Sequence, residues 1–205
     1  MSRSFDSFAA SFESKLAKLS YRAPRLVAAM LEDSGVQAAN ALDVLDAGCG
    51  TGLCGPFLAP YARRLTGVDL SGGMLTQAEA KNLYDELVQE ELTANLAARD
   101  CSLDLIVSAD TLVYFGPLEE VVAAASRALR SGGLFIFTLE RNTEAPPRDF
   151  HLEHHGRYTH GEPYVASLLD RHGFEVEIEY ADLRLECGRP VAGLVVRARK
   201  RPDAR

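Results

Sequence analysis

The sequence predicts an α/β fold in which one mostly parallel sheet carries helices on both faces. Two observations predict it. A buried strand runs directly into a glycine-rich turn within Leu42–Gly55, and later apolar runs of strand type end in carboxylates, at Asp69, Asp110 and Glu140. Ligands bind at the carboxyl ends of the strands in such folds, so these side chains mark an expected ligand edge.

The first strand is expected over Leu42–Ala47, and the turn after it contains Gly48, Gly50 and Gly52. Alternating glycines let the backbone bend sharply and approach a ligand closely, because no Cβ stands in the way. We expect a helix to begin near Leu53, with its free N–H groups aimed at whatever lies over the turn.

The second strand, Arg64–Asp69, ends in a carboxylate 19 residues beyond Gly50. A Rossmann-like βαβ unit places there the acid that accepts both ribose hydroxyls. A nicotinamide dinucleotide requires Gly or Ala where this chain has Leu53, and the lysine-containing triphosphate loop is absent. The turn therefore suits a nucleoside ligand without a phosphate chain.

Apolar spacing, caps and turn residues predict the other elements. Pro24 suits a helix first turn, Ser71 is an N-cap, and Ser131-Gly132-Gly133 is a helix stop. Period-two alternation predicts the C-terminal strands, which are joined through Gly188-Arg-Pro. In chain order, we expect helices at Pro24–Glu32 and Ser71–Ala80, strands at Leu83–Glu90 and Leu103–Asp110, a helix at Leu118–Arg130, a strand at Leu134–Leu139, a helix ending at His172, and strands at Phe174–Leu185 and Val191–Ala198.

Composition bounds the class of protein. The 205 residues are 47% hydrophobic and 25% charged, as expected for one domain over residues 1–205. A net charge of −7 makes nucleic acid an unfavourable partner. No apolar run is long enough for a signal peptide or a membrane-spanning helix, and the four cysteines lack metal-ligand spacing. We therefore expect a cytoplasmic protein with no metal and no membrane partner.

Two motifs carry a family resemblance. Asp46-Ala-Gly-Cys-Gly-Thr-Gly52 and Gly67-Val-Asp-Leu-Ser71 resemble the first and second motifs of class I S-adenosylmethionine-dependent methyltransferases. The resemblance implies a Rossmann-like sheet of seven strands in the order 3-2-1-4-5-7-6, closed by an antiparallel hairpin. It also implies S-adenosylmethionine as cofactor and S-adenosylhomocysteine as product. The chain is most similar to bacterial predicted methyltransferases sometimes fused to tetratricopeptide repeats, although no repeat is present here.

The resemblance also implies the cofactor contacts. Met74 is where the family packs an apolar side chain on the adenine, although core packing is an equal alternative. Glu91 stands where the family commonly has the acid of Ala-Asp-Leu. The full set expected to bind the cofactor is Asp46, Gly48, Cys49, Gly50, Thr51, Gly52, Asp69, Leu70, Met74, Glu91, Leu92 and Asp110.

The N-terminal segment has two interpretations. Phe5, Phe8 and Phe12 recur at helical spacing, so their rings share one face and favour core packing. The pattern is also similar to the family's N-terminal helix that closes over the cofactor. The latter interpretation makes residues 1–35 a helical lid.

The irregular stretch 141–161 is the expected substrate loop, because the family places substrate-binding structure after the fifth strand and long loops are often functional. His160 or Tyr114 is the expected catalytic base, and Arg157 is expected to hold an acidic group of the substrate. Tyr158 and Glu140 complete the expected substrate contacts. The family's Asn/Asp-Pro-Pro-Tyr/Phe motif is absent after Ser108, which disfavours a nucleobase or side-chain amide as acceptor.

The resulting prediction is methyl transfer to a small molecule by a monomer or homodimer, with O-methylation ahead of N- or C-methylation. A second hypothesis keeps the cofactor site but makes the protein a non-catalytic, partner-binding module. A nicotinamide oxidoreductase is disfavoured by Leu53 and by the two C-terminal antiparallel strands.

Overall fold

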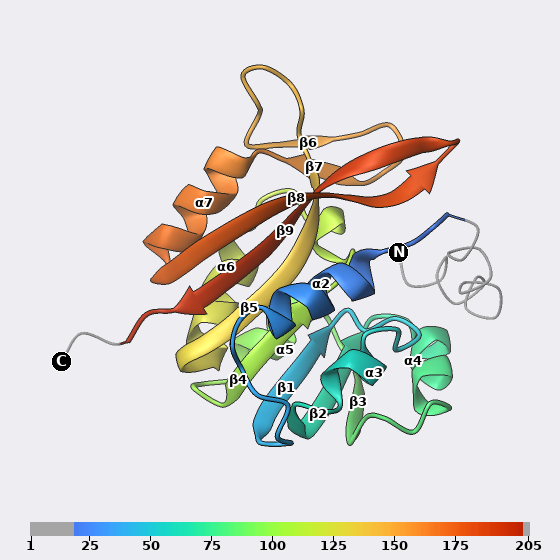
Figure 1. The fold of residues 1–205 in the computed structure, drawn as a ribbon, viewed down its shortest axis with the longest axis vertical. Coiled ribbons are helices and arrows are strands. Elements are labelled where there is room, and N and C mark those ends of the chain that lie inside the picture. Colours follow the sequence, from blue (N-terminus) through green and yellow to red (C-terminus); the bar gives the residue numbers. More distant parts are fainter. Residues whose placement is uncertain (1–18, 203–205) are drawn as a thin grey trace.

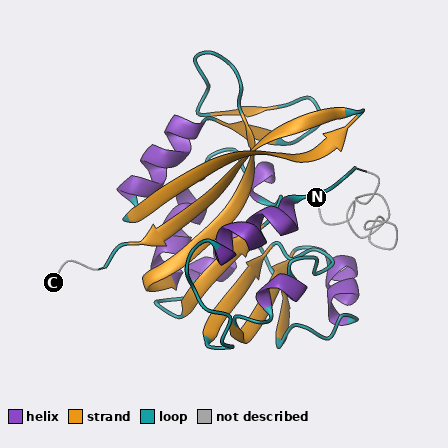
Figure 2. Ribbon diagram, viewed as in Figure 1, coloured by secondary structure: helices purple, strands orange, loops and turns teal. Residues whose placement is uncertain are grey.

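The computed structural model describes residues 19–202, which form one sheet with helices on both faces (Figures 1 and 2). In chain order the elements are α2 (Ala23–Glu32), β1 (Leu42–Ala47), α3 (Gly55–Leu58), β2 (Ala62–Asp69), α4 (Gly72–Glu79), β3 (Glu86–Gln89), α5 (Leu92–Ala97), β4 (Leu103–Ser108), the 3-10 helix η1 (Leu112–Tyr114), α6 (Glu119–Ala128), β5 (Leu129–Arg141), β6 (Phe150–Leu152), β7 (Tyr158–His160), α7 (Glu162–Arg171), β8 (Phe174–Glu186) and β9 (Arg189–Lys200). The expected α/β class is confirmed.

The sheet has nine strands rather than the expected seven, so the predicted order needs correction. Parallel strands run in the order β3-β2-β1-β4-β5. β5 then pairs with both parallel β7 and antiparallel β9, which lead to β6 and β8 respectively. The sixth and seventh strands along the chain are therefore short strands of the 141–161 region, while the long C-terminal hairpin is β8 and β9.

The β6–β7 hairpin lies beyond the carboxyl end of β4. Glu140 of β5 pairs with Thr159 of β7 and with Gly193 of β9, so those two strands flank β5 on opposite sides. Phe137 pairs with β9 and with Ser108 of β4, which puts β7 on the same side as β4, past its last residue. Backbone hydrogen bonds therefore hold residues 141–161, which were expected to be irregular, at the carboxyl edge of the sheet.

Two hydrophobic cores fill the two faces of the sheet. Successive strand residues point to opposite faces, so Val44 joins one core and Leu45 the other. In the same way, Leu105 lies in the core that contains Val44, and Ile106 lies in the core that contains Leu45. One core receives α2 and α3, and the other receives α5, α6 and α7 (Figure 1). Burial on both faces explains why the parallel strands are continuously apolar.

Several element bounds differ from expectation. The helix after the glycine turn was expected to begin near Leu53, but it is a single turn at Gly55–Leu58. The expected third strand is shortened to Glu86–Gln89, and the expected fifth is lengthened to Leu129–Arg141. Helix α5, at Leu92–Ala97, is missing from the prediction. Its single turn and a half is too short to produce a helical apolar period.

The chain approaches the sheet through a short backbone ladder before α2. Leu185 of β8 donates its N–H to the carbonyl oxygen of Leu19 at 2.7 Å, and Arg22 donates to Leu183 at 2.8 Å. Helix α2 then packs in a core through Val27 and its neighbours. The three phenylalanines of the expected lid lie outside the described residues.

The β8–β9 hairpin generates a test of the fold. A Cβ added to Gly193 would lie 2.4 Å from Cγ of the buried Leu183. We expect Gly193→Ala to lower the free energy of unfolding by about 1 to 3 kcal/mol, because overpacking forces a shift of the core. Gly72→Ala is the matched control, since its Cβ would meet only the Gln89 side chain. Equal urea midpoints for the two variants would contradict this packing.

Candidate functional site

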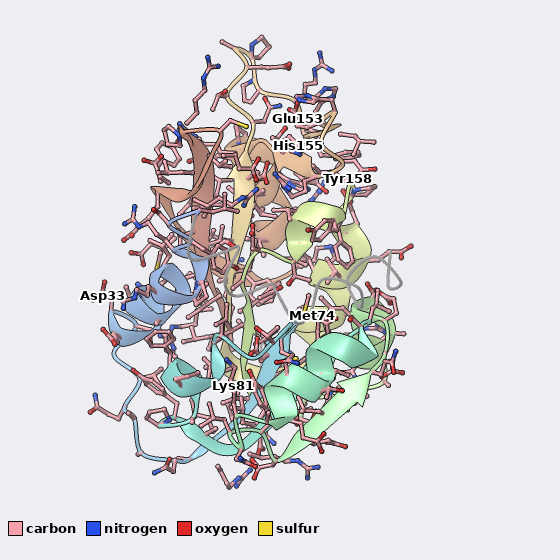
Figure 3. The ribbon with its side chains drawn as sticks, turned by 90° about the vertical axis from the view of Figure 1, so that its right-hand side faces the viewer. Asp33, Met74, Lys81, Glu153, His155 and Tyr158 are labelled. Atoms are coloured by element: carbon pink, nitrogen blue, oxygen red, sulfur yellow. The ribbon has the colours of Figure 1, made fainter. Side chains whose placement is uncertain are left out.

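A cavity of about 400 Å³ opens at the carboxyl ends of β1, β2 and β4. Its lower wall is the glycine turn and the start of α4, and its upper wall comes from η1, the β7 region and the tip of β8. Figure 3 shows Met74 in the lower half of the molecule, with Tyr158 and His155 of the 141–161 region in the upper half. The cavity therefore lies between a lower and an upper part of the molecule that are built from different elements.

The glycine turn adopts backbone conformations that require glycine. Gly48, Gly50 and Gly52 all have positive φ angles, of 78°, 53° and 81°. A Cβ on Gly48 would lie 2.2 Å from Oγ1 of Thr111, whose hydroxyl donates to the Gly48 carbonyl at 3.2 Å. The turn from β1 is thereby locked to the loop after β4.

Asp69 anchors the turn from the end of β2. One carboxylate oxygen accepts the Gly50 N–H at 2.9 Å, and the other accepts the Ser71 N–H at 2.9 Å. A carboxylate has about four acceptor positions and is the kind of group that accepts ribose hydroxyls. Met74, 2% exposed, and Leu70 line the cavity beside it and offer an apolar surface.

Glu91 caps a helix, a structural role that was not expected from the sequence. Its carboxylate accepts the N–H groups of Thr93 and Ala94 at 2.9 and 2.8 Å, which caps α5. Glu91 and Leu92 nevertheless line the cavity, as does Glu90. The family's contact to an adenine amine therefore stays a prediction for Glu91.

Asp46 lies beneath the turn and does not line the cavity. The Tyr84 hydroxyl donates to its carboxylate at 2.6 Å, and the residue is 1% exposed. Burial raises the pKa of Asp46 to about 7, and the Tyr84 hydrogen bond only partly offsets this effect. Gly52 does not line the cavity either, because the Tyr84 ring and Ala78 cover its Cβ direction.

Five charged side chains form an ion network at the upper wall, in which Glu140 and Arg184 are buried and the other three are partly exposed. Arg184, 4% exposed, pairs through Nη1 with both Asp110 oxygens at 2.9 and 3.0 Å, through Nε with Glu186 at 2.7 Å, and through Nη2 with Glu140. Arg157 pairs with Glu140 and Glu186. We call these five residues the edge network.

The edge network shifts the pKa values of its members. Burial opposes the charge of Arg184, but the carboxylates of Asp110, Glu186 and Glu140 outweigh it and raise the pKa of the guanidinium. Burial also opposes ionisation of Glu186, but the hydrogen bond and charge of Arg184 outweigh burial and lower the pKa of this carboxyl group. For Asp110, burial dominates over Arg184 and raises the pKa.

Asp110 has a constrained backbone as well as a shifted pKa. Its φ of 56° lies in the left-handed region, which few residues other than glycine, asparagine and aspartate adopt. Its N–H donates to Oγ1 of Thr138 at 2.8 Å, which holds the loop after β4 against β5. The carboxylate is thus fixed at the cavity wall from both its backbone and its side chain.

Two tyrosines share the wall with Asp110. Tyr21 precedes α2 and Tyr114 ends η1, and both line the cavity. Burial raises the pKa of each phenol, and the nearby Asp110 carboxylate raises it further. Both phenols therefore favour the protonated form and suit donation of a hydrogen bond.

His160 is placed differently from the expectation. Its side chain is 0% exposed, and Nε2 lies 2.9 Å from the Gly116 carbonyl oxygen. Burial lowers its pKa. The ring stacks on Tyr164 and does not line the cavity, which excludes direct contact with a ligand there. His160 holds the β6–β7 hairpin against the loop after η1.

The other expected substrate contacts divide. Arg157 and Tyr114 line the cavity, as do ten of the twelve expected cofactor contacts, all except Asp46 and Gly52. Tyr158 lies against Gly116, and Glu140 lies behind the arginines, so neither lines the cavity.

Sequence reasoning missed Tyr21, Arg184 and Glu186 as cavity residues. Arg184 and Glu186 stand two apart in one strand, which puts them on one face, and that polar pair was a usable signal. The apolar alternation of Val176 and Ile178 obscured it, because the β8–β9 register shifts between Asp182 and Leu185.

Metal and membrane features are also relevant to the site. Among residues 19–202, no three histidine, cysteine, aspartate or glutamate side chains group as metal ligands. None of the helices in the same range is long and apolar enough to cross a membrane. Cys49 and Cys54 are buried free thiols beside the turn, and burial raises the pKa of both.

Comparisons with known proteins agree with this geometry. Residues 45–137 match the family described as Methyltransferase domain. A probable S-adenosylmethionine-dependent methyltransferase of Mycolicibacterium smegmatis is 32% identical over 136 residues, which cover 66% of this chain and 52% of that protein. Human methyltransferase-like protein 27 is 33% identical over 145 residues, covering 68% and 57%. The chain spans about half the length of these curated relatives.

A solved structure supports the fold. The Burkholderia thailandensis 1,6-didemethyltoxoflavin-N1-methyltransferase, determined with 1,6-didemethyltoxoflavin and S-adenosylhomocysteine, aligns with a TM-score of 0.71 at 22% identity. The alignment covers 98% of this chain and 87% of that chain. At this identity the likeness concerns the fold.

Asp46 generates a prediction about pH and stability. Its pKa is raised in the folded state, so its contribution is complete below the unfolded value and is lost as pH rises through about 7. The stability of Asp46→Asn relative to the wild type should grow by about 1 to 4 kcal/mol between pH 4 and 7, then level off. Urea unfolding across this range measures it.

The matched control is Asp33→Asn, which removes an exposed carboxylate at the end of α2. That variant should follow the wild-type curve. A constant difference between Asp46→Asn and the wild type from pH 4 to 8 would show that the Asp46 pKa is not raised.

Proposed function

We propose that this protein, a class I S-adenosylmethionine-dependent methyltransferase by family match and fold, transfers a methyl group to a small-molecule acceptor. The observation that carries the proposal is the pairing of the positive-φ glycine turn with Asp69 at one end of the cavity. A nucleoside fits there, because the turn admits its close approach and the carboxylate accepts its hydroxyls.

The cofactor supplies a methyl group on a sulfonium, which an acceptor displaces in line. The protein's main task is then to hold the acceptor, since positioning removes most of the entropic barrier. The turn, Asp69 and Met74 would hold the nucleoside end. Tyr21, Tyr114 and Asp110 border the opposite end and would orient the acceptor.

The acceptor must lose a proton when it gains the methyl group, and Asp110 is the cavity residue suited to receive it. Desolvation raises its pKa and so strengthens the carboxylate as a proton acceptor, while His160 is outside the cavity. The two phenols would donate hydrogen bonds to the acceptor instead of taking its proton. Asp110 was expected from the sequence to contact the cofactor, and this proposal assigns it to the acceptor instead.

The proposal favours a small acceptor. A cavity of about 400 Å³ lies at the small end of the range for ligand sites, and it must hold the cofactor as well. The structural neighbour's acceptor, 1,6-didemethyltoxoflavin, is a small molecule. O-methylation ahead of N- or C-methylation stays a prediction, as does the choice between monomer and homodimer.

Cofactor binding is the first test. S-adenosylhomocysteine should bind with a dissociation constant of about micromolar order, measured by calorimetry. Asp69→Ala should weaken binding by about 1.5 to 3 kcal/mol, because it removes charge-assisted hydrogen bonds. NAD should produce no heat of binding.

Asp33→Ala is the control, since it removes an exposed carboxylate far from the turn along the chain. Binding of NAD without any response to S-adenosylhomocysteine would refute the proposed cofactor. Binding of S-adenosylhomocysteine without turnover of any acceptor would favour the non-catalytic module.

Turnover is the second test, using acceptors found by screening small hydroxyl and amine compounds for release of S-adenosylhomocysteine. Asp110→Asn should lower kcat/KM by about 10² to 10⁴, the usual contribution of a general base. Asparagine tolerates the left-handed backbone, so the loop should persist. The affinity for S-adenosylhomocysteine should change little. A large loss of that affinity would return Asp110 to the cofactor site.

A further inference from the structure

The edge network has an unequal number of opposite charges. Asp110, Glu140 and Glu186 contribute three carboxylates, and Arg157 and Arg184 contribute two guanidiniums. Its formal charge is therefore −1. Because Arg184 and Glu140 at its centre are buried, this excess is less screened than a surface charge and acts on a ligand beside it.

The arginines have little capacity left for an anionic ligand. Arg184 uses Nε, Nη1 and Nη2 on carboxylates. Arg157 uses Nε on Glu140 and Nη2 on Glu186. An acidic acceptor would have to displace one of these carboxylates, or else bind Nη1 of Arg157 and bring a second negative charge beside the excess one. Both routes cost free energy in a desolvated site.

The remaining wall also suits a cation or a neutral group. Tyr21, Tyr114 and Phe115 line the same end of the cavity. Aromatic faces attract cations through their quadrupole, and protonated phenols donate to neutral oxygen or nitrogen atoms. Glu186 and Asp110 provide carboxylates that line the cavity directly.

We infer that the edge network selects the acceptor by charge: the site takes an amine or a neutral hydroxyl compound and rejects a carboxylate. This inference rests on the proposed function and reverses the expectation that Arg157 holds an acidic group. A cationic amine would dock as R–NH₃⁺, transfer a proton to a carboxylate, and attack the methyl group as R–NH₂. The products are R–NH₂⁺–CH₃ and the thioether.

Two cofactor analogues can report the charge at the point where the methyl group emerges. Sinefungin carries an ammonium-bearing carbon in place of the methylated sulfur, whereas S-adenosylhomocysteine is neutral there. The ratio of their dissociation constants, measured by calorimetry, therefore reports the preference of the acceptor end for a positive charge. Both analogues are measured at the same pH, because His155 lies 3.7 Å from Glu140.

Sinefungin should bind the wild type about tenfold to a hundredfold more tightly than S-adenosylhomocysteine, the range of one charge-assisted hydrogen bond. Glu186→Gln removes one carboxylate charge and should reduce that ratio severalfold. Glu175→Gln, an exposed change on β8, is the matched control and should keep the wild-type ratio.

The outcomes separate the two hypotheses. If both analogues bind the wild type with equal strength, or S-adenosylhomocysteine binds more tightly, the charge selection is wrong and the methyltransferase proposal stands. If neither analogue binds, the proposed function itself fails. The wild-type ratio alone can refute the inference, so the test holds even if Glu186→Gln does not fold.

Discussion

The edge network is the interaction on which the upper half of the site depends. It joins Asp110 after β4, Glu140 in β5, Arg157 before β7, and Arg184 and Glu186 at the tip of β8. Removing one partner of a buried ion pair commonly costs 3 to 5 kcal/mol, because it strands the other charge. The network therefore links both hairpins to the sheet edge and, under the proposed function, sets the charge that an acceptor meets.

The lower half of the site is built on a different principle. Its shape comes from backbone conformation, since Gly48, Gly50 and Gly52 occupy left-handed conformations and Asp69 accepts the Gly50 N–H from the end of the next strand. These contacts are made within one βαβ unit, and few long-range side-chain pairs are needed. The shape of the lower half therefore depends little on the hairpins of the upper half. The division explains why the family match covers residues 45–137 and the hairpins lie outside it.

The same division explains what the sequence could predict. Local signals such as the glycine turn, Asp69 and the apolar strands led correctly to the α/β fold and to most of the cavity's lower wall. The edge network joins Asp110 to Arg184, 74 positions apart, and no local pattern reports such a contact. The β6–β7 hairpin was missed because three-residue strands are too short to show alternation. His160 was misplaced because proximity along the chain to the ligand edge does not determine which way a side chain points.

The most direct measurement of the central claim is a crystal structure of the protein with S-adenosylhomocysteine. The two ribose hydroxyls should lie within hydrogen-bond distance of the Asp69 carboxylate, with the adenine against Met74. The sulfur should face the cavity end bordered by Tyr21, Asp110 and Glu186, because that is where a methyl group must emerge to reach the acceptor. A nucleoside bound away from Asp69, or a sulfur directed away from the edge network, would contradict the division of the cavity into a nucleoside half and an acceptor half.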